Sequence, residues 1–359
     1  MDDQLKFLLY RKDDRDAVFA FLHSVYPPDY AERVIRQWDW KYDANPFKQT
    51  PEPHVTLLKD GARVVGLYGT FPLPFYIEGH ERWGSLGGDW IVHPEYRDRR
   101  LSRRLWEAYN QPQITLHFSW QNEASVRRRG RHEDVNRVQL APLVKPIDFG
   151  HFAHQLSGRA WTRGPVNVAA AGLRAIARPL RRRVAVDGVT ISRIERFDER
   201  FDALAWRARG DYPVMVARGE RYLNWRFVER PGARYTVLAA TSRNELLGYV
   251  VLRSAEKGDE RWGYLVDFLV ADHSAPIIAQ LMDAGVEHLR RDGVKAISCR
   301  AAVPPYRQEL YRCGFYVVQW GPRGYLSAWP KEGDPDYAAF RDVRKWFITM
   351  GDGDLELDF

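Results

Sequence analysis

The chain has 359 residues, of which 45% are hydrophobic and 28% are charged, a composition that excludes a wholly disordered protein. Its two cysteines, Cys299 and Cys313, exclude a disulfide framework or a cysteine-rich zinc site, and we expect both thiols to be buried and unreactive. The ten histidines show no paired spacing typical of metal ligands, so we expect no metal. The first residues are acidic where a secretory signal is basic, and no apolar run reaches the about 20 residues that cross a bilayer. We therefore expect a cytoplasmic protein without a transmembrane segment.

The net charge of +7 is unevenly distributed along the chain. Residues 97–183 hold 18 Lys and Arg against 6 Asp and Glu, and nearly all of these cations are arginines. Clustered arginines suit phosphate contacts, although a solvated charged face is the commoner use of such a run. We expect no DNA partner; a tRNA or an anionic surface is the partner that residues 97–183 would suit.

The sequence contains an internal repeat. Trp40-Lys41-Tyr42 and Trp225-Arg226-Phe227 stand 185 residues apart, and each is followed by a proline, Pro46 or Pro231, at the same distance. Tryptophans at repeat positions are far more often core residues than ligand contacts, so we expect Trp40 and Trp225 to be buried. A repeat of this length predicts two structural units of similar plan.

Each copy continues with the same predicted elements. Two apolar, β-rich runs flank a polar turn in residues 54–70 and again in residues 235–253, which is typical of a β-hairpin, and the first turn holds Asp60-Gly61. A third strand then opens on an acid, Asp89 or Asp267, and is followed by a helix. The next strands are expected at residues 114–118 and 296–300.

These elements predict an α/β (α+β) protein of two similar domains, each a mixed, mostly antiparallel sheet flanked by helices. The predicted divisions are an N-terminal domain 1–150, a basic helical connector 151–187, a C-terminal domain 188–330 and an acidic tail 331–359. The Ala-rich run 168–177 fits a connector helix, with a helix on an anionic membrane surface as the alternative. The tail is expected to be irregular apart from a short helix near residues 337–346.

The most specific stretch runs from Asp89 to Leu105 and predicts a strand, a tight turn at Pro94 and a helix, whose first N–H groups suit an anion. Its sequence resembles motif A of the Gcn5-related N-acetyltransferase (GNAT) superfamily, V-x-P-x-[YF]-R-G-x-G-[IL]-[GA], in which a loop holds the pyrophosphate of acetyl-CoA. The residues that match are Val92, Pro94, Tyr96, Arg97 and Leu101. The family glycines are replaced by Asp98, Arg100 and Ser102, and Arg99, Arg100 and Arg103 are the side chains that would compensate.

The resemblance continues outside this loop. Residues 118–125 are similar to the family's later strand and the start of its helix, with Asn122 opening the N-x-x-[AS] pattern, and residues 310–315 are similar to the ending L-Y-x-x-x-G-F, one residue short. Residues 271–276 of the second copy hold neither Gly nor Arg. The resemblance therefore implies two GNAT-like domains over residues 5–330, with a degenerate acyl-CoA loop in the first copy and none in the second.

The resemblance also implies a function: an acyl-CoA-dependent N-acyltransferase that uses acetyl-CoA or another acyl-CoA. The acyl group, acetyl or another, would pass to an amine of a small molecule or amino sugar by direct attack on the thioester. The implied acyl-CoA contacts are Ile91, Val92, His93, Arg97, Asp98, Arg99, Arg100, Leu101, Ser102 and Asn122, and the backbone N–H groups of residues 91–93 would hold the thioester oxygen. Asp89 is the candidate base, although Asp267 at the matching position keeps a structural role open. Tyr311 is the candidate acid, with packing in the core as the alternative.

Two other functions remain open. Ligases of the Fem type pair two GNAT-like units but take an aminoacyl group from tRNA, and the missing glycines and the basic residues 97–183 fit that interpretation. A non-catalytic tandem scaffold that binds an anionic ligand or a partner protein is the other.

Overall fold

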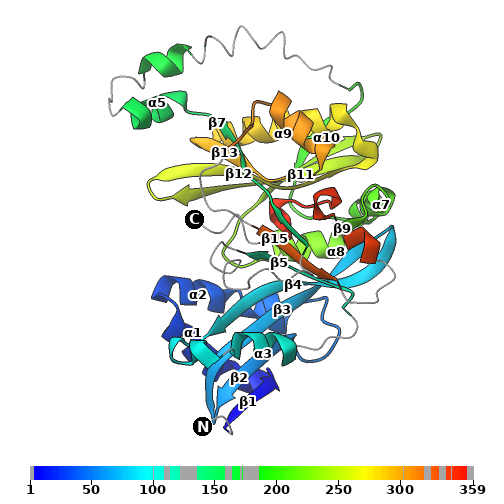
Figure 1. Ribbon diagram of the computed structural model, residues 1–359. Helices are drawn as coiled ribbons and strands as arrows, with labels where there is room; N and C mark the ends of the chain where they lie inside the picture. Colours follow the sequence, from blue (N-terminus) through cyan, green and yellow to red (C-terminus); the bar gives the residue numbers. More distant parts are fainter. Residues whose placement is uncertain are drawn as a thin grey trace.

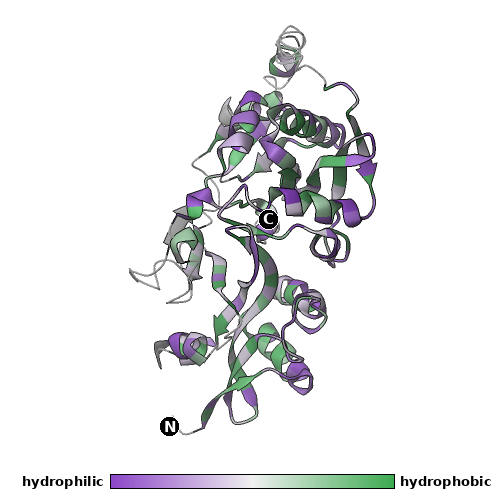
Figure 2. Ribbon diagram, turned by 90° about the vertical axis from the view of Figure 1, so that its right-hand side faces the viewer, coloured by the Kyte–Doolittle hydropathy of each residue, from purple (hydrophilic) through white to green (hydrophobic). Residues whose placement is uncertain are grey.

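The computed structural model describes residues 4–99, 101–108, 114–121, 136–157, 164–169, 172, 186–301, 303–318, 325–330, 337–340 and 342–353. Two β-sheets with helices on their faces lie one above the other, and the C-terminal residues run between them (Figure 1). Hydrophobic residues concentrate on the strands and on the helix faces that cover them (Figure 2).

The first sheet has eight strands, and all of its pairs are antiparallel except β4–β5. In spatial order they are β1 (Leu5–Leu9), β2 (Val55–Asp60), β3 (Arg63–Ile77), β4 (His80–Val92), β5 (Leu116–Gln121), β15 (Tyr325–Pro330) and β6 (Asn136–Gln139), with β9 (Val214–Val216) paired to β3. The hairpin between β2 and β3 turns at Asp60-Gly61 as predicted, and Gly61 takes the positive φ of 57° that glycine adopts without strain.

The second sheet repeats this plan with seven strands. In spatial order they are β8 (Thr190–Ile194), β10 (Thr236–Ser242), β11 (Glu245–Lys257), β12 (Glu260–Val270), β13 (Ala296–Cys299), β7 (Leu143–Pro146) and β14 (Tyr316–Val317). Here too one pair is parallel, β12–β13, in the place of β4–β5. The predicted fold class, two mixed and mostly antiparallel sheets of similar plan, is therefore confirmed.

Each half of the chain contributes strands to the other sheet: β9 and β15 of the second half join the first sheet, and β7 of the first half joins the second. β15 follows the second sheet in sequence yet lies between β5 and β6, and β7 precedes the second sheet yet lies between β13 and β14. The division of the chain into domains at residues 150, 187 and 330 stays a prediction. The structure shows in addition that the two halves exchange strands. Because β7 and β15 are each paired on both sides, the two sheets are tied together by backbone hydrogen bonds.

Helices pack against the faces of the sheets. They are α1 (Arg15–Val25), α2 (Pro28–Arg36), α3 (Leu101–Ala108), α5 (Phe149–Ser157), α7 (Glu199–Ala208), α8 (Glu220–Leu223), α9 (Ala275–Arg291) and α10 (Pro304–Arg312). α8 lies between the two sheets (Figure 1). Leu101 and Leu105, one helical turn apart, are fully buried and bring α3 onto β2 and β3. No helix in the described part of the chain is long and apolar enough to cross a membrane.

Three local expectations differ from the structure. β4 begins at His80, so Asp89 stands near the end of a long strand and does not open a short one. The expected tight turn at Pro94 is a 3₁₀ helix over Pro94–Arg99, which then leads toward α3. The strand expected at residues 114–118 lies at Leu116–Gln121.

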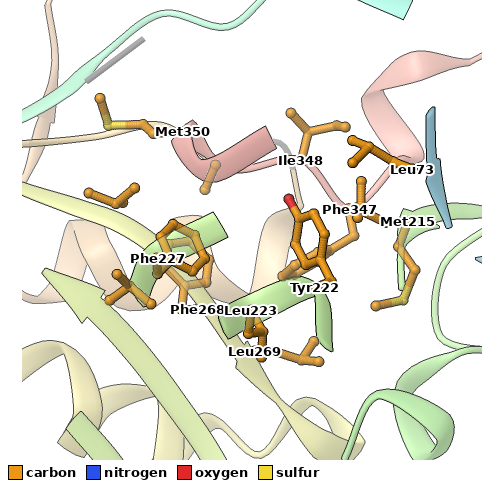
Figure 3. Close-up of a cluster of buried hydrophobic side chains, with 14 of the residues drawn as sticks. Leu73, Met215, Tyr222, Leu223, Phe227, Phe268, Leu269, Phe347, Ile348 and Met350 are labelled. Atoms are coloured by element: carbon orange, nitrogen blue, oxygen red, sulfur yellow. The ribbon is translucent and has the colours of Figure 1, made fainter. Parts of the chain in front are cut away.

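The C-terminal tail is a core element. It forms 3₁₀ turns at Tyr337–Phe340, Val343–Lys345 and Met350–Asp352. The apolar residues between them are fully buried and pack against residues of both halves, as Figure 3 shows for Phe347, Ile348 and Met350. A tail that is acidic overall is therefore held by its apolar residues, which the expectation of an irregular segment missed.

Two further expectations concern buried cysteines and the connector. Cys299 and Cys313 are buried free thiols, as predicted, and burial raises the pKa of Cys299. Most of the Ala-rich run 168–177 lies outside the described residues, as does the basic triplet that follows it.

Candidate functional site

Strands β4 and β5 separate near their C-terminal ends. Their parallel pairing stops at Leu86 and Phe118, while β4 continues to Val92 and β5 to Gln121. The β3–β4 register also shifts between Tyr68 and Thr70, which places a bulge in β4 at residues 88–89. We call residues 87–92 and 119–121 the β4–β5 fork. A bulge beside an unpaired strand end exposes backbone groups that a ligand can use.

Asp89 lies on this bulge and is held by two side chains. The hydroxyl of Tyr42 donates to Oδ2 at 2.7 Å, and Nζ of Lys41 lies 3.1 Å from the same oxygen. The backbone N–H of Asp89 donates back to the Tyr42 oxygen at 3.2 Å. Asp89 is 8% exposed, and no donor among the described residues reaches its Oδ1. One carboxylate oxygen is therefore fixed and the other is left to accept a proton.

Two glycines make room for this arrangement. A Cβ at Gly69 or at Gly88 would stand 2.5 Å from the hydroxyl oxygen of Tyr42, closer than real Cβ contacts come. The phenol of Tyr42 therefore enters between the two backbones at the bulge. Lys41 and Tyr42 belong to a π-helical segment, Asp39–Asp43, whose wider turn is a frequent feature of functional sites.

Two tyrosines from the junction of α1 and α2 lie beside Asp89. The rings of Tyr26 and Tyr30 are 4.7 Å apart. Burial raises the pKa of both phenols, and the negative charge of Asp89 raises them further. Tyr30 is nevertheless 42% exposed, so solvent reaches this side of Asp89.

The backbone N–H groups of residues 91–93, which were expected to hold the thioester oxygen, point in two directions. The N–H of His93 donates to the carbonyl of Val65 in β3 at 2.8 Å, so it is not available to a thioester, contrary to expectation. Because N–H groups alternate along an antiparallel strand, that of Ile91 also faces β3. The N–H groups of Trp90 and Val92 face the fork.

The other residues that were expected to contact acyl-CoA differ in their exposure. Arg97 is exposed, and its Nε donates to the Val92 carbonyl at 3.2 Å. Leu101 is a core residue and Ser102 is exposed on α3. The backbone of Asp98 and Arg99 belongs to the 3₁₀ helix, and Arg100 and Asn122 lie outside the described residues.

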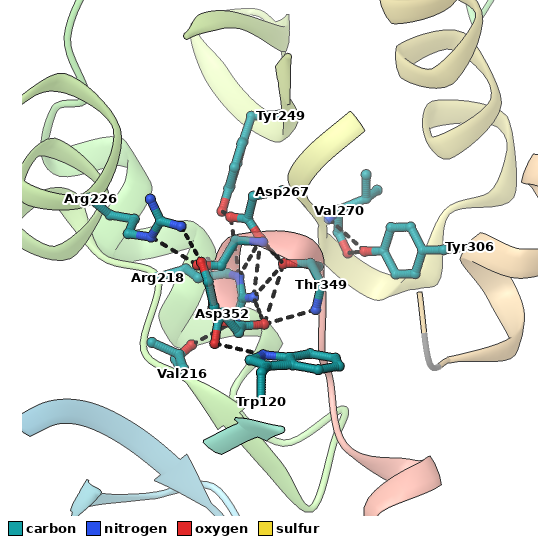
Figure 4. Close-up of polar contacts among 12 residues, drawn as sticks. Trp120, Val216, Arg218, Arg226, Tyr249, Asp267, Val270, Tyr306, Thr349 and Asp352 are labelled. Atoms are coloured by element: carbon teal, nitrogen blue, oxygen red, sulfur yellow. Dashed lines mark hydrogen bonds and ion pairs between the residues drawn. The ribbon is translucent and has the colours of Figure 1, made fainter. Parts of the chain in front are cut away.

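The second sheet uses the matching acid differently. Asp267 is 1% exposed and accepts hydrogen bonds from Arg218 at 3.1 Å, from Tyr249 at 2.7 Å and from Thr349 at 2.6 Å. Arg218 also pairs with Asp352 of the tail (Figure 4). Both oxygens of Asp267 are engaged, so this carboxylate has a structural role in the second sheet.

The matching fork in the second sheet is closed by a side chain. The β12–β13 pairing stops at Leu265, and β12 continues to Val270, the counterpart of Val92. The N–H of Val270 donates to the hydroxyl of Tyr306 at 2.9 Å (Figure 4). Tyr306 is fully buried and its ring stacks on Phe268 at 4.7 Å. A tyrosine of α10 thus occupies the place where the first sheet has its fork.

The candidate acid Tyr311 lies elsewhere on α10. It is 43% exposed and accepts a hydrogen bond from Arg307 at 2.7 Å, so the alternative that it packs in the core is wrong. In the described residues no group of three or more His, Cys, Asp or Glu could hold a metal ion.

Comparison with solved structures identifies the architecture. A GCN5-related N-acetyltransferase from Anabaena variabilis matches 90% of this chain and 72% of its own length, with a TM-score of 0.59 and 10% identity. The chain has the fold of the GCN5-related N-acetyltransferases. The enzyme from Kribbella flavida matches 90% of this chain and 70% of its own length, with a TM-score of 0.54 and 11% identity. No protein-family model and no curated protein sequence matches the chain.

The fold is shared with a second group. Saccharomyces cerevisiae N-myristoyltransferase, whose structure holds myristoyl-CoA, matches 91% of this chain and 82% of its own length, with a TM-score of 0.54 and 11% identity. The two sheets of the present chain give the tandem arrangement of the GNAT fold that the sequence repeat predicted.

Sequence reasoning missed the two side chains that hold Asp89. Lys41 and Tyr42 follow Trp40 in the repeated triplet, and Gly88 precedes Asp89, so all three stood next to residues already singled out. A lysine and a tyrosine where the second copy has Arg226 and Phe227 were the available signal.

Proposed function

We propose that the chain is an acyl-CoA-dependent N-acyltransferase, and that the β4–β5 fork takes the thioester of acetyl-CoA or another acyl-CoA. The observation that carries the proposal is the difference between the two forks. In the first, the N–H groups of Trp90 and Val92 face the fork beside Asp89; in the second, Tyr306 takes the matching N–H of Val270. The shared fold with acyltransferases supports this assignment. The acceptor is an amine of a small molecule or amino sugar.

The chemistry follows from the two sides of the bulge. An amine next to Tyr26 and Tyr30 gives its ammonium proton to Oδ1 of Asp89, while Lys41 and Tyr42 hold Oδ2. The neutral nitrogen attacks the thioester carbon, and the N–H groups of Trp90 and Val92 stabilise the negative charge on the thioester oxygen. A general base of this kind typically contributes about 10²–10⁴-fold to the rate.

The test compares the two equivalent acids. Asp89→Asn should lower kcat by about 10²–10⁴-fold and leave the Kd for CoA within about twofold, and the loss should shrink at high pH, where more of the amine is neutral. Asp267→Asn is the matched control and should lower the melting temperature without that kinetic loss. A fully active Asp89→Asn enzyme would remove Asp89 from the mechanism.

Ligand binding separates this function from the other two. Calorimetric titration should detect CoA and acetyl-CoA, and Arg97→Ala and Arg100→Ala should weaken both, because a phosphate group gains from each arginine contact. Binding of tRNA without CoA would favour an aminoacyl-tRNA-dependent ligase. Absence of both would favour a non-catalytic scaffold.

A further inference from the structure

A row of side chains along α2 leads to the residues that hold Asp89. Tyr30, Arg33 and Gln37 stand three and four residues apart, so they follow one another along one face of the helix. Lys41 comes four residues later, and its N–H donates to the carbonyl of Gln37 at 2.9 Å. Nζ of Lys41 then lies 3.1 Å from Oδ2 of Asp89. The face of α2 that carries Arg33 therefore ends beside this carboxylate.

The exposed ring of Tyr30 is shared by two opposite charges. Cζ of Arg33 lies over this ring, 4.5 Å from its centroid, which is a cation–π distance. Burial raises the pKa of the Tyr30 phenol, the negative charge of Asp89 raises it further, and the positive charge of Arg33 lowers it. The ring of Tyr26 stands 4.7 Å away on the same side of Asp89. A carboxylate and a guanidinium thus lie at the two sides of one small aromatic surface.

The guanidinium of Arg33 is suited to an anionic oxygen group. Its stacked face rests on Tyr30, while the five N–H donors of a guanidinium point outward in its plane. A carboxylate or a phosphate takes two of these donors in a bidentate pair, so an arginine that already bonds within the protein can still bind one. Arg33 is half-buried, and a charged hydrogen bond is stronger where part of the water is excluded.

We propose that Arg33 binds an anionic group of the acceptor, so that the acceptor is an amine that also carries a carboxylate or a phosphate. The inference rests on the function proposed above and narrows its acceptors. The amine lies at Asp89, the anionic group lies at Arg33, and the atoms that join them rest on the ring of Tyr30. Tyr30 is 42% exposed, so solvent and substrate reach this surface. An amine without the anionic group leaves Arg33 to water and binds less tightly.

Matched pairs of acceptors test this assignment, with thiol release from acetyl-CoA as the readout. One set pairs each of several amino acids with its methyl ester, and the other pairs phosphoethanolamine with ethanolamine. Arg33→Met should lower kcat/KM for the anionic member by about 10–100-fold, the effect of a lost charge-assisted pair. The loss should lie mainly in KM, and the neutral member should change by less than about threefold. A loss confined to one set identifies the anion as carboxylate or as phosphate.

Two further variants separate recognition from a general effect of charge. Arg36→Met is the matched control, because exposed Arg36 lies one turn further along α2, with Nη1 4.0 Å from the position of a Cβ on Gly232. It should lower kcat/KM for either member of a pair by less than about threefold, since exposed charges are screened by salt. Arg33→Lys keeps the charge and loses the planar pair of donors, so it should fall between the wild type and Arg33→Met.

Three results would overturn the role of Arg33. They are an equal loss of Arg33→Met on both members of every pair, a loss in Arg36→Met as large as in Arg33→Met, and a wild-type enzyme that binds CoA but does not react with the anionic acceptors. A wild-type protein that neither binds CoA nor releases thiol with any amine would instead overturn the proposed function, and this inference with it.

Discussion

Trp40 and Trp225 hydrogen-bond to each other's backbone. The indole N–H of Trp40 donates to the carbonyl of Trp225 at 2.8 Å, and that of Trp225 donates to the carbonyl of Trp40 at 3.1 Å. Their rings stack with centroids 4.6 Å apart and planes 15° apart. Both residues lie in π-helical segments. The two copies of the repeat therefore contact each other through equivalent residues, as two subunits do in a symmetric dimer.

This contact predicts strong coupling between the two tryptophans. Trp40→Ala should lower the free energy of unfolding by about 3–5 kcal/mol, because a buried indole and its hydrogen bond to the Trp225 carbonyl are lost. Trp225→Ala should cost about as much, and the double variant should cost much less than the sum, since each single change already breaks the pair. Trp206→Ala, at a residue 53% exposed, is the control and should cost less than about 1 kcal/mol. Additive losses in urea unfolding would show that the pair does not act as a unit.

Gly88→Ala should disconnect Tyr42 from Asp89. The new Cβ would meet the Tyr42 oxygen at 2.5 Å and Cε of Lys41 at 3.0 Å, so both side chains must move. We expect kcat to fall by at least about tenfold and stability by about 1–3 kcal/mol, the range for overpacking. Gly210→Ala, where a Cβ meets nothing within 4 Å, is the matched control. A Gly88→Ala enzyme with wild-type kcat would show that the position of Tyr42 does not matter for turnover.

His54 should make the protein sensitive to mild acid. Burial lowers the pKa of this residue, which is 1% exposed, from 6.5 to about 4. Between these values the unfolded chain binds a proton that the folded chain does not, so stability falls as the pH drops from 6.5 to 4 and this effect ends below 4. The loss is about 3 kcal/mol. Urea unfolding of His54→Leu should show a flatter pH dependence, whereas exposed His23→Leu should keep the wild-type slope. Equal slopes in wild type and His54→Leu would contradict the assignment.

Arg218→Met should lower stability, and the loss should depend on pH. Arg218 lies between Asp267 and Asp352, all of them buried, and burial raises the pKa of Asp352. Removing the cation leaves two carboxyls without it, at a cost of about 3–5 kcal/mol near neutral pH. The cost should be smaller at pH 4.5 than at pH 8, because protonated carboxyls need no cation. Arg261→Met, in an exposed pair with Glu256, should cost less than about 1 kcal/mol at either pH. A loss for Arg218→Met that does not vary with pH would contradict this reading of the cluster.

The sequence predicted what depends on local patterns and on the repeat. The Asp60-Gly61 hairpin and the buried Trp40 and Trp225 follow from turn chemistry and from residue spacing.

Long-range pairing was beyond the sequence. β7 and β15 are short apolar segments, and nothing within them states that each crosses to the other sheet. Tyr42 and Asp89 are 47 residues apart and meet only because a π-helical turn and two glycines bring the phenol to the bulge. Tyr306 closes the second fork from α10, a role that no residue type or spacing indicates. Such contacts are set by tertiary packing, which single-sequence patterns do not encode.

We propose that the first fork binds acyl-CoA and that the second does not. Hydrogen exchange of backbone amides, measured with and without saturating CoA, tests it directly. Protection should appear in peptides that cover residues 87–101 and 117–121, where N–H groups face the ligand, and peptides over residues 266–276 should be unchanged because Tyr306 already holds Val270. Protection of residues 266–276 with none in residues 87–101 would place CoA binding in the second sheet and remove it from the first.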